Sequence, residues 1–575
     1  MTEVLNNFVG QMEGWVWNSG IPVGDETIPF VVILLLGAGI YFTFRLSFVQ
    51  FTRLGHGFAV VSGKYSDPDD PGDVSHFQAL STALSATVGI GNIAGVALAI
   101  HWGGPGALFW MWVTAILGMA TKFSEVTLAQ KYRNVRDPDP TRPWEGMIAG
   151  GPMFYIEKGL GRAWKPLAVI FAVFLASVAL FTGNGVQANT VADVFNTEFG
   201  FAPWAVGLVT ATLVGLVIIG GISRIGKVAG ILAPAMAALY VAGALLILAL
   251  HWDQILPSLA LIFAEAFNPS AGAAGVGVGT FLFTMLWGVR RGLFSNEAGQ
   301  GSAPIAHAAA RTNEPVSEGV VGLLEPFIDT IVICTMTALV IIITSAWDDR
   351  VPTELDLMAG TVSYVQERED GRFAFFQSAP SEITVQDGTP TASGVGETML
   401  AWHDVAVERF YVDPAQTQPF SGTIFPETGL AVAQDGTEYP SLYGDAVVNG
   451  APLTMLAFQR GLPGEWGRYI VLLTVFLFAI STALAWSYYG DRCAYYLFGP
   501  RAVLPYKLLF VGMHFFGAVA PLIIAWTIGD ILLGLVIIPN LLALILLTGK
   551  VREESDSYFS RKPWLRSGSS RREDS

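Results

Sequence analysis

The stretch LFSNEAGQGSAPIAHAAA, residues 293–310, lies inside a long apolar segment and yet combines polar side chains with helix-breaking residues. The polar side chains are Ser295, Asn296, Glu297, Gln300 and Ser302, and the helix-breaking residues are Gly299, Gly301 and Pro304. In a helix interior, glycine costs about 1 kcal/mol and proline about 3 kcal/mol relative to alanine. At membrane depth, the backbone groups released by a break must be satisfied by protein, water or a ligand. The stretch therefore predicts either a kinked, buried helix or a broken helix that forms a substrate or ion site.

The composition is that of a polytopic membrane protein. Of 575 residues, 52% are hydrophobic and 14% are charged, whereas soluble domains carry about 25% charged residues. The net charge of −15 arises mostly from one segment, 346–450, so it indicates a solvated insert rather than a nucleic-acid partner. Two cysteines and seven histidines form no disulfide framework or metal motif. We therefore expect a protein that is not an enzyme and has no cofactor.

Apolar segments of transmembrane length predict eleven helices in a lipid bilayer. They are 28–48, 76–100, 105–131, 165–195, 203–220, 225–250, 277–309, 318–346, 466–490, 503–526 and 528–549. Five loops expected on one side, 1–27, 101–104, 196–202, 251–276 and 527–530, contain no Lys or Arg, whereas the loops on the other side and the tail 550–575 carry basic residues. By the positive-inside rule, this partition predicts a bacterial inner-membrane protein with a periplasmic N-terminus and a cytoplasmic C-terminus.

The same partition places the acidic segment 347–465 outside the membrane. Alternating runs at 361–366 and 373–376 and the dipeptides Asp387-Gly388, Asp435-Gly436 and Asn449-Gly450 predict a compact, partly β module. Two roles are open for it: it concentrates cations over the substrate path, or it only solubilises the protein.

A second interrupted segment, SATVGIGNIAGVA at 85–97, lies in the second predicted span and contains three glycines around Asn92. Spans 76–250 form one five-helix unit, and 277–346 with 466–549 form another, each opened by an interrupted helix. Residues 1–75 hold an additional N-terminal helix. The pattern is typical of inverted-repeat transporters, so we expect an all-α membrane protein with a 5+5 repeat. Half-helix N-termini suit a carboxylate, and unwound carbonyls suit Na⁺ or an ammonium group.

Five motifs resemble the alanine or glycine:cation symporter family, the sodium:alanine symporters. They are TVGIGNIAGVA at 87–97, GMATKFSEVTLAQKYR at 118–133, GGPMFYIEKGLG at 150–161, FSNEAGQGSAPIAHA at 294–308 and STALAWSYYGDR at 481–492. The resemblance implies a LeuT-type core with one extra N-terminal helix. It also implies import of a small neutral amino acid, usually alanine or glycine, with Na⁺ as the coupling ion. The insert departs from the compact pattern of the family.

The substrate site is expected where the two breaks meet. The backbone at Gly89, Gly91 and Asn92 is the candidate for the carboxylate, and Ser295 and Asn296 would complete the pocket.

The resemblance adds Gln187, Thr482 and Trp486 to the substrate site. Thr482 and Trp486 are four residues apart and so share a helical face. The indole of Trp486 either fills the space that a longer substrate side chain would need, or is an ordinary packed or interfacial aromatic.

The LeuT-type arrangement holds Na⁺ with oxygen ligands. By this resemblance, Thr87 and Ile90 would supply carbonyls and the hydroxyls of Ser481 and Thr482 would face them. We take Ser481 as the ion ligand and Thr482 as the pocket residue.

Ionisable residues in the apolar spans are functional candidates by default. Lys122 and Glu125, three residues apart, are expected to pair, and Glu297 lies in the central break. We expect structural or gating roles for these charges, with proton coupling as the alternative to Na⁺.

A receptor that senses amino acids through the insert is a competing class, as is a passive channel. The short charged tail after Gly549 carries no output domain, and paired broken helices favour alternating access. The oligomeric state is not indicated by the sequence.

Overall fold

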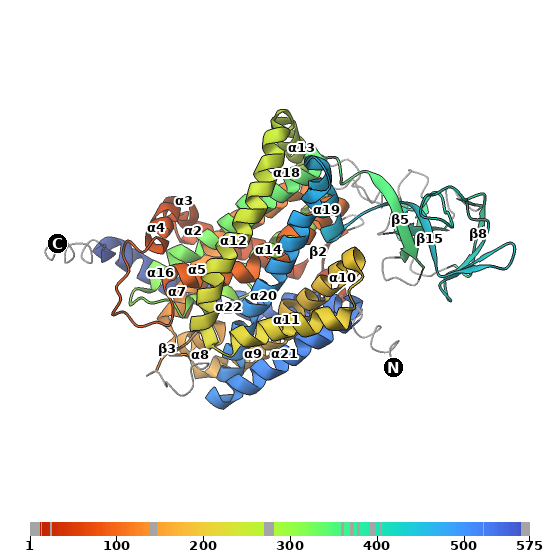
Figure 1. Ribbon diagram of the computed structural model, residues 1–575. Helices are drawn as coiled ribbons and strands as arrows, with labels where there is room; N and C mark the ends of the chain where they lie inside the picture. The colour runs from red at the N-terminus through yellow and green to blue at the C-terminus, as the bar shows by residue number, and fades with distance from the viewer. Residues whose placement is uncertain are drawn as a thin grey trace.

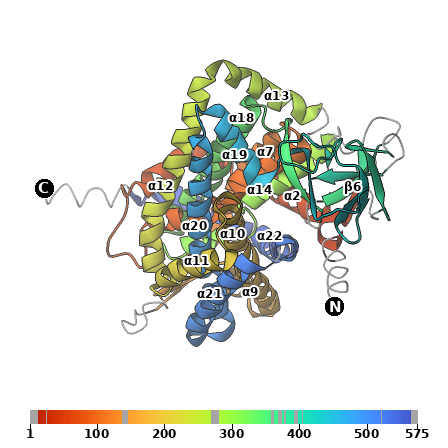
Figure 2. The same ribbon diagram turned by 45° about the vertical axis from the view of Figure 1, so that its right-hand side comes forward.

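The computed structural model describes residues 12, 14–23, 26–136, 146–268, 281–357, 362–367, 373–375, 380–391, 398–402, 405–520 and 522–564. The chain forms a bundle of packed helices from which a β-stranded module projects at one end (Figures 1 and 2). We call this end the insert side. We call the opposite end, where the C-terminal end of α22 (Leu522–Arg561) lies, the tail side (Figure 1).

Helices occupy all eleven segments predicted to span the membrane. Besides α22 they are α2 (Phe30–Arg45), α5 (His76–Thr87), α6 (Val96–Gly103), α7 (Ala107–Lys131), α9 (Lys165–Leu180), α10 (Gln187–Phe199), α11 (Pro203–Ile218), α12 (Gly221–Leu250), α14 (Phe281–Asn296), α15 (Ala303–His307), α16 (Pro315–Gly322), α17 (Leu324–Pro326), α18 (Thr335–Ile343), α20 (Trp466–Phe498) and α21 (Val503–Val519). Shorter helices connect them: α3 (Val49–Thr52), α4 (Leu54–Val61), α8 (Pro152–Leu160), α13 (Ile255–Phe267) and α19 (Gly450–Gly461).

The length and apolarity of these helices establish a multi-pass membrane protein. Among the described residues, seven helical stretches are long and apolar enough to cross a membrane, or eight if the bent pair α5 and α6 counts as one span. Two further apolar helices, α2 and α11, have 16 residues each. Large apolar side chains on the bundle surface, such as Leu216 and Ile231, are exposed as lipid-facing residues are. The total of eleven spans remains a prediction, and residues 277–280 of the seventh lie outside the described part.

Both predicted helix breaks are present. The first lies between α5 and the wide helical turn η2 (Gly91–Gly95), which continues into α6, and the two halves are bent by 52°. At the second, α14 ends at Asn296, and Glu297, Gly299 and Gly301 take φ values of 53°, 91° and 78° before α15 begins. Left-handed φ values end a right-handed helix, and two glycines adopt them without steric cost. The sequence composition of residues 293–310 therefore produces a true break.

Two more spans contain wide turns that the sequence analysis did not predict. The turn η4 (Phe181–Val186) joins α9 to α10, and η6 (Phe327–Cys334) joins α17 to α18. Such π-type turns occur frequently at functional sites. Both extend the irregular backbone around the centre of the bundle.

The insert is a β module, as predicted. Strands β5 (Arg350–Asp356) and β15 (Ser441–Val447) pair antiparallel and connect it to the bundle. One sheet has the order β11-β10-β6-β7 and another the order β14-β13-β12-β8-β9. Their strands are β6 (Val362–Glu367), β7 (Phe373–Phe375), β8 (Ile383–Gln386), β9 (Thr389–Pro390), β10 (Thr398–Trp402), β11 (Val405–Ala406), β12 (Gly422–Phe425), β13 (Leu430–Ala433) and β14 (Glu438–Tyr439).

The predicted turn dipeptides have different outcomes. Asp387-Gly388 joins β8 to β9 with φ values of 48° and 80°, as expected for a tight hairpin. Asp435-Gly436 lies between β13 and β14. Asn449-Gly450 does not join two strands: the Asn449 side chain accepts a hydrogen bond from the Gly450 N–H and caps α19. An Asx residue stabilises a helix N-terminus as readily as a turn, so the dipeptide alone does not separate the two.

Candidate functional site

A cavity of about 350 Å³ lies between the two helix breaks. This volume includes open space at the mouth of the cavity, so the enclosed part is much smaller. It is lined by Ala86, Thr87, Gly89, Ile90, Gly91, Thr182, Gln187, Phe294, Glu297, Gln300, Thr482, Trp486 and Leu533. The wall therefore combines both breaks with η4, α10, α20 and α22.

Most of the predicted substrate and ion residues meet at this cavity. Those that line it are Thr87, Gly89, Ile90, Gly91, Gln187, Thr482 and Trp486. Asn92, Ser295, Asn296 and Ser481 are buried but are not part of its wall. The first group is in position to touch a bound molecule, and the second acts through its neighbours.

Asn92 is the centre of a buried hydrogen-bond network behind the cavity. Its side-chain oxygen accepts the Gly89 N–H at 2.8 Å, and its amide nitrogen donates to Ser295 at 3.1 Å and to the carboxylate of Asp329 at 2.6 Å. Ser295 also donates to Asp329 at 2.6 Å. One carboxylate from η6 thus holds side chains of both broken helices. Asp329 was missing from the predicted site because nothing local in the sequence shows that it faces Asn92.

Asn296 supports the turn of the second break. Its side-chain oxygen accepts the N–H of Ala298 at 3.1 Å, and its amide lies 3.4 Å from the Thr330 hydroxyl. These contacts give it a role in shaping the break rather than in lining the cavity.

The two hydroxyls of α20 approach the end of α5. Thr482 Oγ1 donates to the carbonyl of Ser85 at 3.0 Å, and Ser481 Oγ lies 3.4 Å from the same carbonyl and 2.9 Å from that of Phe478. The prediction for Thr87 and Ile90 was that their carbonyls and these hydroxyls bind one Na⁺ together, and it stays a prediction. Thr482 Oγ1 also lies 3.5 Å from the carbonyl of Ala86, so the contacts on α5 are made by carbonyls of its last turn, which the end of the helix leaves without an intrahelical partner.

Trp486 is almost completely buried, with 2% of its surface exposed, so it is not an interfacial aromatic. Its ring lies directly on η4: a Cβ atom at Gly183 would be only 2.3 Å from the indole. Gln187, at the start of α10, donates to the carbonyl of Thr182 at 3.3 Å. Glycine at position 183 therefore lets the indole reach the cavity wall beside Thr182 and Gln187.

Glu297 and Gln300, both from the second break, also line the cavity. The carboxylate of Glu297 accepts a hydrogen bond from Ser302, and Gln300 donates to the carbonyl of Leu293 at 3.2 Å. Glu297 was predicted to have a gating or structural role, and no role was predicted for Gln300. Four further wall residues, Ala86, Thr182, Phe294 and Leu533, were also not assigned individually. The glycines at 183 and 185 were the only local signal for Thr182.

The predicted pairing of Lys122 with Glu125 is wrong. Lys122 donates to Glu325 at 2.9 Å, whereas Glu125 accepts from Asn540 at 2.6 Å. All four side chains are completely buried. A buried charged group needs a partner with good hydrogen-bond geometry. For Lys122 and Glu125 these partners lie on other helices, not on α7 itself.

A larger cavity of about 710 Å³ adjoins the first and shares Phe294, Gln300 and Leu533 with it. Trp17, Trp287, Arg290 and Arg291 line its remaining wall together with Leu293. The Arg290 guanidinium lies 4.9 Å from the Trp17 ring, and that of Arg291 lies 5.2 Å from the Trp287 ring. Trp287 stacks on Trp102 near the insert, so this cavity forms an approach from the insert side.

Comparison with known proteins identifies the family. The sequence profile of the sodium:alanine symporter family matches residues 2–368 and 420–572, leaving unmatched only part of the insert and the chain ends. AgcS, a sodium/alanine symporter of Methanococcus maripaludis, is 40% identical over 532 residues, or 92% of this chain and 94% of AgcS. GlnT of Bacillus subtilis, a probable sodium/glutamine symporter, is 30% identical over 98% of this chain and 92% of its own.

A third relative, YrbD of Bacillus subtilis, has a name that describes a sodium/proton-dependent alanine carrier protein. It is 31% identical over 94% of this chain and 90% of its own length. With its site between two helix breaks in a multi-pass membrane bundle, the chain belongs to the sodium:alanine symporter family and is a cation-coupled amino-acid symporter, not an enzyme.

Proposed function

We propose that the protein imports a small neutral amino acid, alanine or glycine, together with Na⁺ by alternating access. One observation carries this proposal: the small cavity between two broken helices has the indole of Trp486 as part of its wall. A large rigid aromatic in a small pocket leaves room for a methyl group or a hydrogen and excludes longer side chains. Each methylene in such a pocket is worth about 1–3 kcal/mol of discrimination.

The substrate carboxylate fits the first break. The backbone at Gly89 and Gly91 lines the cavity, and Asn92 fixes this turn through the Gly89 N–H. Amide groups at the start of a helical segment attract anions through their N–H groups and the helix dipole. The ammonium group would then face oxygen atoms of the second break and of Gln187.

For Na⁺ we propose a site at the contact between α5 and α20. The carbonyl of Ser85 and the hydroxyls of Ser481 and Thr482 already converge there. Adding the carbonyls of Thr87 and Ile90 gives the all-oxygen shell that a hard cation requires.

The architecture and orientation are part of the same proposal. Units 76–250 and 277–346 with 466–549 form a LeuT-type 5+5 repeat behind the extra helix of 1–75. The insert 347–465 lies in the periplasm and the tail 550–575 in the cytoplasm of a bacterial cell. The loop charges support this orientation, and the two guanidinium groups in the insert-side cavity suit the approach of an amino-acid carboxylate.

Proton coupling is the second candidate. It is favoured by one observation, the buried carboxylate of Glu297 in the cavity wall. Intramembrane carboxylates frequently belong to proton pathways.

The deciding experiment is uptake of labelled alanine into proteoliposomes. An inward Na⁺ gradient is compared with an inward H⁺ gradient in Na⁺-free buffer. Accumulation with Na⁺ alone supports the proposal, and accumulation with H⁺ alone replaces it by the Glu297 alternative. Absence of uptake under both gradients would disprove alanine as the substrate.

Two variants test the site itself. We expect Trp486→Ala to raise the uptake of valine relative to alanine by about tenfold, the equivalent of 1.4 kcal/mol. We expect Asn92→Ala to lower alanine uptake because the first break loses its support. The control is Trp15→Ala, whose side chain is 61% exposed and lines neither cavity. Normal alanine uptake and selectivity in both site variants would contradict the assignment.

A further inference from the structure

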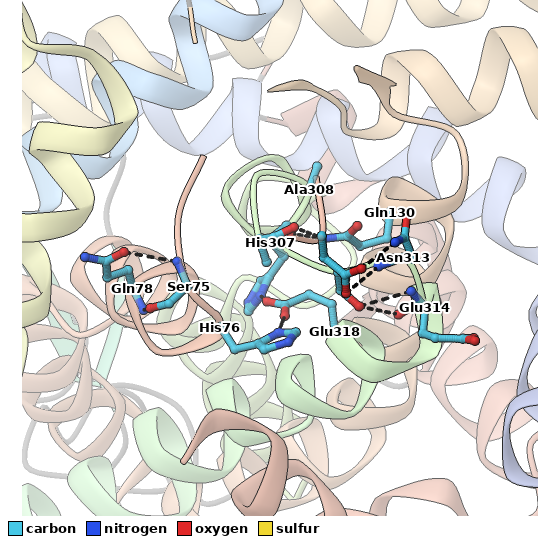
Figure 3. Close-up of polar contacts among 12 residues, drawn as sticks. Ser75, His76, Gln78, Gln130, His307, Ala308, Asn313, Glu314 and Glu318 are labelled. Atoms are coloured by element: carbon cyan, nitrogen blue, oxygen red, sulfur yellow. Dashed lines mark hydrogen bonds and ion pairs between the residues drawn. The ribbon is translucent and has the colours of Figure 1, made fainter. Parts of the chain in front are cut away.

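Three buried ionisable side chains meet in Figure 3, on the tail side of the bundle where α5 and α16 lie in Figure 1. His76 is the first residue of α5, His307 is the last residue of α15, and Glu318 lies in α16. Nδ1 of His76 contacts one oxygen of Glu318, and Nδ1 of His307 lies 2.5 Å from the other. The exposed fraction is 3% for His76 and 0% for His307 and Glu318. A single carboxylate therefore bridges the tail-side halves of the two broken helices.

The donor and acceptor roles follow from the groups themselves. An ionised carboxylate has only acceptors, so each imidazole donates its Nδ1 proton to Glu318. Hydrogen bonds to a charged partner are about twice as strong as those between neutral groups. Burial strengthens them further because no water competes for the same atoms.

The contacts continue from His307 to α7. His307 Nε2 lies 3.7 Å from Glu325, whose other oxygen accepts from Lys122 at 2.9 Å. Lys122 and Glu325 are fully buried. At 3.7 Å, the contact between His307 and Glu325 is too long for a hydrogen bond, so the charges of Glu325 and Lys122 lie close to the bridge without being bonded to it.

The backbone next to these side chains is paired as well. The N–H groups of Asp73 and Val74, just before α5, donate to the carbonyl of Ala309, just after α15, at 2.9 and 3.2 Å. Arg311 N–H returns a bond to Val74 at 2.8 Å. Gln130 of α7 donates to the carbonyl of His307 at 2.6 Å. The segment entering one broken helix and the segment leaving the other are therefore joined side by side.

The two half-helices need such support. With 12 residues in α5 and five in α15, neither reaches the length at which an isolated helix is stable. Both lead directly into the cavity, α5 through Thr87 at its end and α15 through Gln300 before its start. Independent movement of either half would change the shape of the cavity.

We propose that Glu318 is a positioning residue that clamps the tail-side halves of both broken helices into one unit with α7 and α16. The clamp acts through His76 and His307 and keeps the two sides of the substrate site in register. Its consequence for transport rests on the proposed transport function, whereas the clamp itself does not.

The test is hydrogen exchange of the purified full-length protein, followed by mass spectrometry. We expect Glu318→Leu, which keeps the side-chain volume but has no acceptor, to raise amide exchange at least tenfold in both 76–87 and 303–311. Local opening determines these exchange rates. Glu318→Gln should give an intermediate result, since the amide retains one acceptor. The matched control is Glu314→Leu, because Glu314 is close in sequence but pairs with Arg561 near the surface. Exchange that rises in neither segment, or equally in the control, would overturn the proposal.

Single histidine variants provide a second test that does not depend on the folding of Glu318→Leu. We expect His76→Gln to raise exchange in 76–87 and His307→Gln to raise it in 303–311. Adding His76→Gln to Glu318→Gln should change little, because the bond is already weakened. Independent, additive effects would show that no shared clamp exists.

Transport separates the clamp from the proposed function. In proteoliposomes, we expect Glu318→Leu to raise KM for alanine at least tenfold, because the two sides of the cavity are no longer held in register, and Glu318→Gln to raise it less. If the wild-type protein transports no alanine, the proposed function is wrong, and the exchange experiment still decides the clamp. An unchanged KM in Glu318→Leu would contradict the positioning role.

Discussion

The two broken helices meet at both of their ends, and the two contacts are chemically different. On the insert side, the Trp102 ring of α6 stacks on Trp287 of α14, with centroids 5.3 Å apart and planes at 10°. On the tail side, His76 and His307 bind the carboxylate of Glu318 (Figure 3). One contact is between aromatic faces, and the other is a directional bridge between buried charged groups.

The aromatic stack on the insert side can shift sideways, whereas the Glu318 bridge on the tail side cannot. Stacked aromatic rings contribute about 0.5–1.5 kcal/mol beyond their buried area and tolerate lateral shifts. Buried charge pairs have narrow geometry, and removing one partner costs about 3–5 kcal/mol. We therefore expect the insert-side halves to separate more readily than the tail-side halves.

The insert contacts the looser end. A small apolar cluster of the module packs against Trp102; its members are Val365, Met399, Ala401, Val405, Ala406 and Val447. Part of this module, 369–419, is the segment that the family profile does not match. The insert is thus in position to influence the insert-side contact directly and the tail-side clamp only indirectly.

The largest effect should come from Lys122→Ala on the tail side. It leaves Glu325 buried without its ammonium partner, and we expect a loss of about 3–5 kcal/mol in stability. Thermal unfolding in detergent measures it. The double variant Lys122→Met with Glu325→Leu should recover part of the loss, because no unpaired charge remains. A double variant as unstable as the sum of its single changes would contradict the pairing.

Trp102→Ala should have a smaller effect, about 1–2 kcal/mol, because Trp102 is only partly buried and the lost contact is a stack. Trp287→Ala combined with it should add little, since either change removes the same contact. Thermal unfolding of the four proteins gives the coupling energy. Coupling close to zero would show that the stack contributes nothing to stability.

Removing most of the insert should have a still smaller energetic effect, measured here as the change in KM for transport. Leu357 N–H donates to the carbonyl of Pro440 at 3.2 Å, so a short Gly-Ser joint between these residues preserves the pairing of β5 with β15. We expect KM for alanine to change by less than about threefold, or 0.7 kcal/mol. Reactivity of Trp102 toward an aqueous oxidant should increase. A large rise in KM would instead make the insert part of the substrate path.

The smallest effect should follow Arg561→Ala at the tail. Arg561 binds Glu314 through two bonds of 2.8 and 2.9 Å, but both side chains are partly exposed. Exposed pairs contribute about 0–1 kcal/mol and weaken with salt. We expect Arg561→Ala to lower the unfolding temperature slightly at low salt. At 1 M NaCl we expect no shift, because the Debye screening length is then only about 3 Å. A shift that does not depend on salt would show that this ion pair is shielded from solvent like the buried pairs of the tail side.

Local patterns predicted where the helices break, whereas the resemblance to the family supplied Gln187, Thr482, Trp486 and the Na⁺ ligands. Glycine and proline marked both breaks because their backbone preferences act within a few residues. The four-residue spacing of Thr482 and Trp486 placed both on one face, and both line the cavity. The Asp-Gly dipeptide at 387–388 predicted a hairpin for the same local reason.

Partners distant in sequence were not predictable in this way. Lys122 had a plausible partner three residues away in Glu125, yet it binds Glu325, 203 residues along the chain. Asp329 lies 237 residues from Asn92, and the sequence next to either residue does not predict their contact. The wide turn η6 contains neither glycine nor proline, so no local pattern predicted it.

By itself, the sequence determined that this chain spans a membrane repeatedly, where its helices break, and that an acidic β module interrupts it. Those properties depend on hydropathy and on backbone preferences, which are set by each residue and its neighbours in the sequence. Only the tertiary structure decided which side chains face the cavity and that Glu318 joins His76, 242 residues away, to His307. A buried carboxylate needs donors wherever the packing brings them, and the sequence order of the helices does not specify their neighbours in space.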